Sequence, residues 1–296
     1  MKKIISIALV VIMIASALAL VACNGGNKEY VAIDAIDLLQ EDFGIATKKG
    51  DTAMLNAVNE VINEWVANGT MDKYVEYYTQ LADYDAGAAE KPEAGDLKTS
   101  WNFGNNGKIT VYTESGFAPF EFLSGQDIIG VDIAIMSEVA ERQGKSIEVK
   151  DVNFNAIPLS VKNDSGDAVG AAGLTITESR KEVVDFSAVY YSSTLVIVSA
   201  KDMAYDEISD LAGLKVGVQE STSGDIIASL ADTNEGYSYV TEDENGEEVT
   251  VTVKSDIKQI SRYKQYSLAF MDLKNGRIDA IVMDKLPALR MLNLIG

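Results

Sequence analysis

The chain has 296 residues, enough for two lobes that each bury a core of their own. Its formal net charge of −20 argues against a nucleic acid or an anionic membrane surface as a partner. The absence of histidine and the single cysteine exclude histidine-based triads, histidine metal sites and an internal disulfide.

The N-terminal stretch has the layout of a bacterial secretion signal. Lys2 and Lys3 lead an apolar run that ends at Cys23. This layout resembles a lipoprotein signal peptide over residues 1–22, whose cysteine is acylated and becomes the mature N-terminus. The alternative is an uncleaved membrane anchor, because the run is nearly long enough to span a bilayer. Both interpretations place the folded part outside the cytoplasm, and the first predicts lipid anchoring to the bacterial cell membrane.

The next part of the chain combines short strands with helices. The patterns predict a strand at 29–33, a connection at 34–42, a short strand within 43–50, and helices at 52–68 and 71–81. Residues 82–107 are rich in Ala, Gly, Asp, Glu and Pro and have no period, which is typical of a linker.

Strands and helices alternate over the remainder, which predicts α/β sheets with right-handed crossovers. The expected strands are 108–112, 146–152, 167–175, 195–199, 214–218, 257–260 and 278–283, and the expected helices are 131–143, 225–230, 266–275 and 286–294. A β-hairpin is expected over 237–253, because Asn245-Gly246 is a dipeptide that two-residue hairpin turns favour.

The stretch Gly173-Leu-Thr-Ile-Thr-Glu-Ser-Arg180 places an arginine one helical turn after a cap. Thr177 has the character of an N-cap. The Arg180 guanidinium, beside Thr175 and the backbone at Gly173, makes a fork suited to one carboxylate. For this stretch alone, the alternative is a strand, a turn and a surface arginine paired with an acidic neighbour.

Several further motifs accompany this stretch. They are Gly116-Phe-Ala-Pro-Phe-Glu-Phe122, Ile129-Gly-Val-Asp-Ile-Ala134, Val184-Asp-Phe-Ser187 with Tyr190-Tyr191, Asp210-Leu-Ala-Gly-Leu-Lys-Val-Gly-Val218 and Gly276-Arg-Ile-Asp-Ala-Ile-Val-Met-Asp284. Together they resemble the extracytoplasmic solute-binding proteins of polar amino acid ABC transporters, over about residues 109–294. The resemblance implies a two-lobe α/β fold of the type II periplasmic-binding-protein kind, with ligand in the cleft between the lobes.

The order of the motifs departs from the family pattern in one place. The family's C-terminal elements stand here at the front, as Phe43-Gly-Ile-Ala-Thr-Lys-Lys-Gly50, Asn68-Gly-Thr70 and Met71-Asp-Lys-Tyr74. The simplest explanation is circular permutation, with 82–107 as the linker between the family's original termini. This predicts lobe 1 at 43–81 and 108–193, and lobe 2 at 24–42 and 194–296. The alternatives are an unrelated helical domain over 24–81 and a fragment of a tandem fusion.

The resemblance also implies roles for residues around the cleft. Arg180, assisted by Thr175 and a backbone N–H at Ser223, would hold the α-carboxylate of an amino acid, and a helix N-terminus is itself a good anion site. Asp284, with the Gly173 carbonyl and the Thr175 hydroxyl, would hold the ammonium. The alternatives are a plain helix cap for Asp284 and an ordinary turn for Ser223.

Four more residues would surround the ligand's side chain. Phe117 and Phe154 match the family's aromatic walls, although each alone is compatible with a place in the core. Glu114 and Gln219 stand where the family reads the side-chain tip, and an acidic residue there favours a cationic or amide tip. A solvated turn residue is the alternative for Glu114. The family often has a tyrosine near position 117, so its absence leaves hydrogen bonding from that ring open.

The implied function is capture of a polar amino acid by a monomeric lipoprotein, which closes its lobes on the ligand and delivers it to an ABC permease. No catalytic residue, cofactor or metal is expected. One alternative is an amino-acid-sensing lipoprotein that docks to a receptor. Another is an enzyme, because the same fold hosts cyclohexadienyl dehydratases and domains of lytic transglycosylases.

Overall fold

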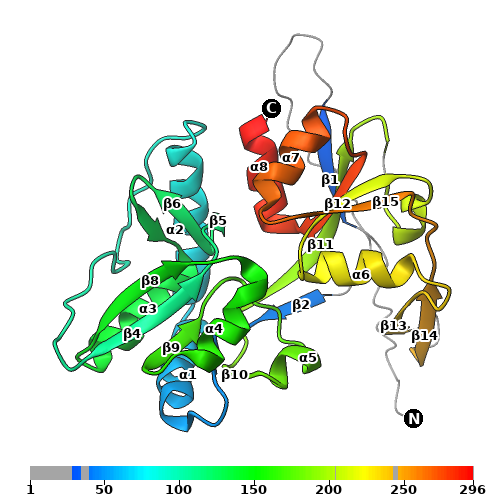
Figure 1. The fold of residues 1–296 in the computed structure, drawn as a ribbon. Coiled ribbons are helices and arrows are strands. Elements are labelled where there is room, and N and C mark those ends of the chain that lie inside the picture. The colour runs from blue at the N-terminus through cyan, green and yellow to red at the C-terminus, as the bar shows by residue number, and fades with distance from the viewer. Residues whose placement is uncertain (1–28, 35–39, 204, 243–245, 296) are drawn as a thin grey trace, which may run out of the picture.

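The computed structural model describes residues 29–34, 40–203, 205–242 and 246–295 (Figure 1). The predicted signal peptide and its Cys23 lie outside the described residues, as does Asn245 of the hairpin turn. Among the helices that the structure describes, none is long and apolar enough to cross a membrane.

The described residues form two α/β lobes, each built on its own sheet (Figure 1). The sheet of lobe 1 has the order β10-β3-β9-β4-β8. Its strands are β3 (Ala46–Lys48), β4 (Lys108–Thr113), β8 (Ser146–Asp151), β9 (Asp167–Gly170) and β10 (Val184–Phe186). Its helices are α1 (Thr52–Ala67), α2 (Thr70–Asp85), α3 (Val131–Arg142), α4 (Ile157–Asn163) and α5 (Glu178–Lys181). A small ribbon, β5 (Gly116–Phe117), β6 (Glu121–Ser124) and β7 (Asp127–Ile129), lies beside it.

The sheet of lobe 2 has the order β1-β11-β16-β12-β15. Its strands are β1 (Tyr30–Asp34), β11 (Tyr191–Ala200), β12 (Lys215–Gln219), β15 (Gln259–Tyr263) and β16 (Ala280–Asp284). Helix α6 (Ser223–Ala231) covers one face, and α7 (Tyr266–Lys274) and α8 (Lys285–Ile295) cover the other. The predicted hairpin is present as β13 (Tyr237–Glu242) and β14 (Glu248–Val253).

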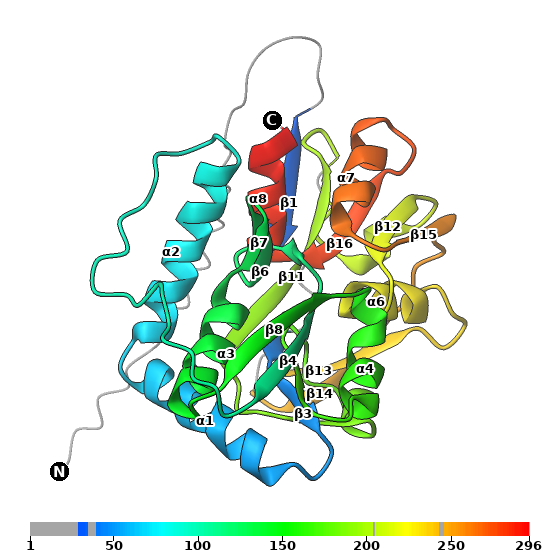
Figure 2. The same ribbon diagram turned by 60° about the vertical axis from the view of Figure 1, so that its left-hand side comes forward.

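The segment before the linker contributes to both lobes. Strand β3 pairs antiparallel with β9 and with β10, so it lies inside the lobe 1 sheet. Helix α1 packs on α3, on the outside of the lobe (Figure 2). Strand β1 pairs with β11 in the lobe 2 sheet. A separate helical domain over 24–81 would share no sheet with the rest of the chain, so that alternative is wrong.

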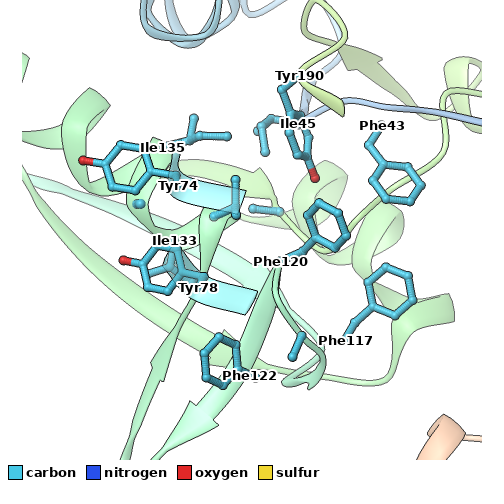
Figure 3. Close-up of a cluster of buried hydrophobic side chains, with 14 of the residues drawn as sticks. Phe43, Ile45, Tyr74, Tyr78, Phe117, Phe120, Phe122, Ile133, Ile135 and Tyr190 are labelled. Atoms are coloured by element: carbon cyan, nitrogen blue, oxygen red, sulfur yellow. The ribbon is translucent and has the colours of Figure 1, made fainter. Parts of the chain in front are cut away.

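An aromatic cluster joins α2 to the ribbon and to the strand that leaves lobe 1 (Figure 3). Tyr74 stacks on Trp65 at 4.5 Å between ring centroids, and Phe120 meets Phe43 edge-on at 5.2 Å. Burial of such rings contributes a few kcal/mol each to stability. Tyr74 and Tyr78 of α2 therefore pack in the core.

The structure differs from the predicted elements in several bounds. The strand predicted over 167–175 ends at Gly170, because the chain turns into a loop in which Gly173 has φ +52°. A Cβ there would lie 2.6 Å from the Phe117 ring. Glycine is therefore required both by the left-handed backbone and by the close approach of this ring. Part of the predicted connection 34–42 is a strand, β2 (Gln40–Phe43), and α2 continues to Asp85, into the predicted linker.

Two buried carboxyl groups lie in lobe 1 where the ribbon meets α3. Asp132 accepts a hydrogen bond of 3.0 Å from the Gly173 N–H, and burial raises its pKa to about 7. Glu121 has no exposed surface and neither of its oxygens has a hydrogen-bond partner among the described residues. Burial first, then repulsion by Asp132, raises the pKa of Glu121 well above its usual range. Glu121 is therefore held neutral in the folded state, and this lowers the free energy of unfolding more as the pH rises.

We expect Glu121→Gln to increase stability at neutral pH. In the parent, Glu121 is protonated in both states below the unfolded pKa of about 4.3 and costs nothing there. As pH rises above that value, only the unfolded state releases the proton, so the parent loses up to about 1.4 kcal/mol per pH unit relative to the variant. Urea unfolding at pH 4 and pH 8 measures the difference. Glu182→Gln, at an exposed site, is the control; parallel pH curves for Glu121→Gln and parent would contradict the expectation.

Ile62→Ala tests whether α1 belongs to the core of lobe 1. Ile62 is fully buried on the face that α1 presents to the core. Its truncation should lower the free energy of unfolding by about 2–5 kcal/mol. Asn63→Ala, the exposed neighbour on the same helix, should change it by less than about 0.5 kcal/mol. Equal effects of the two changes would mean that α1 is peripheral.

Candidate functional site

The two lobes are joined by two paired strands, β2 and β11 (Figure 1). Their antiparallel register places Tyr191 opposite Phe43 and Ser193 opposite Glu41. Beyond this pairing, β11 continues into the lobe 2 sheet between β1 and β16. Beside this crossing, Arg180 of lobe 1 reaches Ser221 of lobe 2 and a pocket is lined by both lobes, and we call this junction the cleft.

Arg180 lies at the rim of this cleft, on the short helix α5. Thr177 caps α5 as predicted, since its side chain accepts from the Arg180 N–H. The guanidinium donates to the Thr175 carbonyl at 2.8 Å and, across the cleft, to the Ser221 carbonyl at 3.0 Å. Its carbon lies 5.1 Å from the centroid of the Phe154 ring. Burial lowers the pKa of Arg180 while Glu41 and Asp284 oppose that change, and the side chain remains partly exposed at the pocket that it lines.

Thr175 and Ser223 meet across the cleft. The Ser223 hydroxyl donates to the Thr175 hydroxyl at 3.2 Å. Ser223 is the first residue of α6, with Thr222 as N-cap, whereas the helix was expected to begin two residues later. First-turn N–H groups have no partner within their helix, so this terminus suits an anion. Thr175, Ser223 and Arg180 thus form one group of hydrogen-bond donors.

Glu114 lies at another part of the cleft, between two amide side chains of lobe 2. Gln219 donates to it at 3.1 Å and Gln265 at 2.7 Å. With 3% of its surface exposed, Glu114 is not the solvated turn residue of the alternative interpretation. Burial raises its pKa, and the two amides oppose the rise. Sequence reasoning missed Gln265, which precedes α7 and had no motif to mark it.

Two further carboxyl groups meet where the lobes join. Asp284 is the last residue of β16, directly before α8, and Glu41 lies on β2. Burial raises the pKa of Asp284 to about 6. Burial, and secondly repulsion by Asp284, raise the pKa of Glu41 well above its usual range, while Ser223 and Arg180 oppose the rise. Glu41 was missed too, although strand alternation from the buried Phe43 would have turned it inward.

Phe117 and Gly173 line the lobe 1 side of the cleft. The Phe117 ring stacks on Phe120 of its own lobe at 5.7 Å between centroids (Figure 3). It also stacks on Tyr266 of lobe 2 at 6.4 Å. The left-handed backbone at Gly173 allows that ring to approach closely. Phe117 and Phe154 are both buried, so each is part core and part cleft wall.

An open pocket of about 480 Å³ continues outward from Arg180 at the mouth of the cleft. Both lobes line it, with Phe154 and Ser179 on one side and Asp225 and Arg262 on the other. Arg262 is paired to Asp225 at 2.9 Å. Among the described residues there is no cluster of three or more acidic, histidine or cysteine side chains that could hold a metal ion.

Comparison with known proteins gives a consistent family. The sequence profile of "Bacterial extracellular solute-binding proteins, family 3" matches residues 109–281. The "Arginine-binding extracellular protein ArtP" of Bacillus subtilis is 35% identical over 150 residues, which are 50% of this chain and 58% of that protein. The "ABC transporter arginine-binding protein 1" of Escherichia coli is 29% identical over 191 residues, 64% of this chain and 68% of that protein.

Solved structures of the same kind resemble the fold. The arginine-bound, truncated ArgBP of T. maritima has a TM-score of 0.51 at 31% identity, over 62% of this chain and 77% of that one. An ancestral arginine-binding protein bound to glutamine has a TM-score of 0.52 at 29% identity, over 64% of this chain and 74% of that one. These neighbours confirm the two-lobe type II fold.

The match leaves part of each protein uncovered. The chain spans 58% of the length of the Bacillus subtilis protein and 60% of a probable histidine-binding protein of Neisseria gonorrhoeae. The profile nevertheless covers more than half of this chain, from β4 to β16. The chain belongs to the bacterial extracellular solute-binding proteins of family 3.

Proposed function

We propose that this protein binds a polar amino acid with a cationic or amide tip in the cleft between its lobes and delivers it to the membrane permease of an ABC transporter. The observation that carries this proposal is that Arg180, from lobe 1, reaches lobe 2 at Ser221 and lies close enough to the buried Asp284 of lobe 2 to oppose the rise in pKa that burial causes there. A free amino acid is a zwitterion, and burying either of its charges unpaired would be costly. A cation and an acid that face each other across a cleft match both charges.

The α-carboxylate would lie against Arg180, Thr175 and the N-terminus of α6 at Ser223. In the described structure the guanidinium donates to two backbone carbonyls, which are neutral acceptors. Hydrogen bonds to a charged acceptor are roughly twice as strong, so a carboxylate competes well for these donors. The ammonium would lie at Asp284, with the Gly173 carbonyl close by.

The ligand's side chain would extend along Phe117 towards Glu114. Glu114 lies between the amides of Gln219 and Gln265. Together they offer carboxylate and amide oxygens as acceptors to a side-chain tip that donates several hydrogen bonds. Arginine fits this chemistry best, with a cation–π contribution from the aromatic wall. The names of the relatives support this choice: the Bacillus subtilis and Escherichia coli proteins are arginine-binding proteins, and the Neisseria gonorrhoeae protein is a probable histidine-binding protein.

Delivery would follow from closure. Arg180 and Thr175 belong to one lobe and Asp284 and Ser223 to the other, so a bound ligand bridges the lobes and favours the closed state. The closed state presents one composite surface to a permease. Anchoring of a monomer through Cys23 would keep the protein at the membrane.

We also propose that the chain is a circular permutation of the family's usual order. The profile begins at residue 109, whereas β1, β2 and β3 already contribute to the sheets of both lobes. Moving residues 24–81 behind residue 296 should then yield a protein that folds and binds the same ligand. A rearranged chain that folds without binding would count against permutation.

Arg180→Ala should abolish amino acid binding. Loss of the guanidinium leaves the ligand's carboxylate without its charged partner, which should reduce affinity at least 100-fold. Isothermal titration calorimetry (ITC) against the twenty amino acids first identifies the ligand and then measures the loss. Lys181→Ala, an exposed cation on the same helix, is the control and should bind normally. No binding to the parent by any amino acid, from a folded sample, would overturn the proposed function.

Glu114→Gln should change which tip is preferred. Removing the buried charge should lower the affinity for L-arginine by about 10- to 100-fold. The affinity for L-glutamine should change little, because the amide of the new side chain retains an acceptor and adds donors. Competition between the two amino acids reports the ratio directly. An unchanged ratio would place the side-chain tip away from Glu114.

A further inference from the structure

Glu41 and Asp284 lie on strands that both pair with β11. Glu41 is opposite Ser193 of β11, and Asp284 is opposite Leu195 of the same strand. Both side chains are more than nine-tenths buried, at 7% and 6% exposure. Ser193 and Leu195 point to the same face of β11, so the two carboxyl groups lie on one face of the strand that joins the lobes, close enough that Asp284 raises the pKa of Glu41.

Few charges are available to compensate this pair. Arg180 of α5 is the cation that acts on both carboxyl groups. The other titratable groups that face them are Tyr191 of β11, Tyr266 of α7 and Glu121 of β6, all neutral or acidic. When an amino acid is bound, its α-carboxylate takes up Arg180. The pair then needs another cation.

Two buried carboxyl groups in contact cannot both be ionised without such a cation. Before a ligand binds, one proton shared between a carboxylic acid and a carboxylate would relieve this repulsion. One oxygen of Asp284, Oδ1, is buried and has no hydrogen-bond partner in the described structure. An unpartnered buried acceptor in this position can accept a hydrogen bond from a donor that a ligand brings.

This inference rests on the proposed function and deepens it. We propose that Glu41 joins Asp284 as a second ligand of the bound ammonium group, and that this ammonium displaces the proton that the two carboxyl groups share. The displaced proton leaves to bulk water, and the ammonium group keeps its three protons. The positive charge of the ammonium replaces the positive charge of the lost proton. Asp284, Glu41 and the Gly173 carbonyl then accept one ammonium N–H each.

Affinity consequently depends on pH. Binding requires the pair to be deprotonated, so protons compete with the ligand. Below the pH at which the empty pair begins to lose its shared proton, affinity for the amino acid falls by up to tenfold per pH unit. The cleft would load its ligand at neutral pH and release it more readily in an acidic medium.

Calorimetric proton counting tests the proposal. L-arginine is titrated into the full chain at pH 7 in phosphate, Hepes and Tris, whose ionisation enthalpies differ. The slope of the observed binding enthalpy against the buffer's ionisation enthalpy gives the number of protons released. We expect the parent to release about one proton. Glu41→Gln should release close to none and should bind L-arginine at least tenfold more weakly. Asp42→Asn is the matched control, because Asp42 is the exposed neighbour on β2 and bonds to Ser192. It should release the same proton as the parent.

The parent alone gives a second test that depends on no variant. Its affinity for L-arginine, measured from pH 5 to pH 8, should rise with pH over this range. Binding without proton release, or equal release by parent and Glu41→Gln, overturns this inference and leaves the proposed function intact. If L-arginine does not bind, the panel's tightest amino acid replaces it, and failure of every amino acid overturns both proposals together.

Discussion

The antiparallel pairing of β2 with β11 is the constraint on which the rest of this structure depends. It joins the lobes, and because β11 continues into the lobe 2 sheet, it also fixes that sheet relative to the cleft floor. The same pairing turns Glu41 and Phe43 inward on one face of β2, one towards the carboxyl groups and the other into the aromatic cluster. A shift of one residue in this register would exchange the buried and exposed side chains of β2. Glu41 and Phe43 would then both point to solvent.

The lobes meet through polar contacts that a ligand can replace. Ser221 accepts from Arg180, Thr175 accepts from Ser223, and Glu114 accepts from two glutamines. A neutral hydrogen bond such as Ser223–Thr175 contributes about 0.5–1.5 kcal/mol net and one to a charged group about 1.5–3 kcal/mol, so no single contact locks the cleft. In the proposed binding mode, they hold the donors and acceptors near the positions where a zwitterion would need them. Preorganisation of this kind reduces the entropy lost when a ligand binds.

The charge balance of the cleft favours a cation. Glu41, Asp284, Glu114 and Glu121 all have raised pKa values for which burial is the largest cause, and Arg180 is the cation that acts on the first two. Each acid is easier to ionise when positive charge arrives with the ligand. The chain's net charge of −20 extends the same preference beyond the cleft. An acidic amino acid would be repelled both by the acidic groups of the cleft and by the net negative charge of the chain.

Local sequence signals determined much of this protein: the α1 and α3 helices, the Thr177 cap, the place of Arg180 one turn after that cap and the residues of the family motifs. These depend on neighbours within one or two turns, which a sequence displays directly. Tertiary structure decided the rest. Gln265 reaches Glu114 across 151 positions, and Glu41 meets Asp284 only because both strands flank β11. Strand β9 ends at Gly170 although apolar residues continue, because the Asp132 carboxylate holds the Gly173 N–H in a loop. Such contacts are set by packing between distant segments, for which periodicity and composition contain no signal.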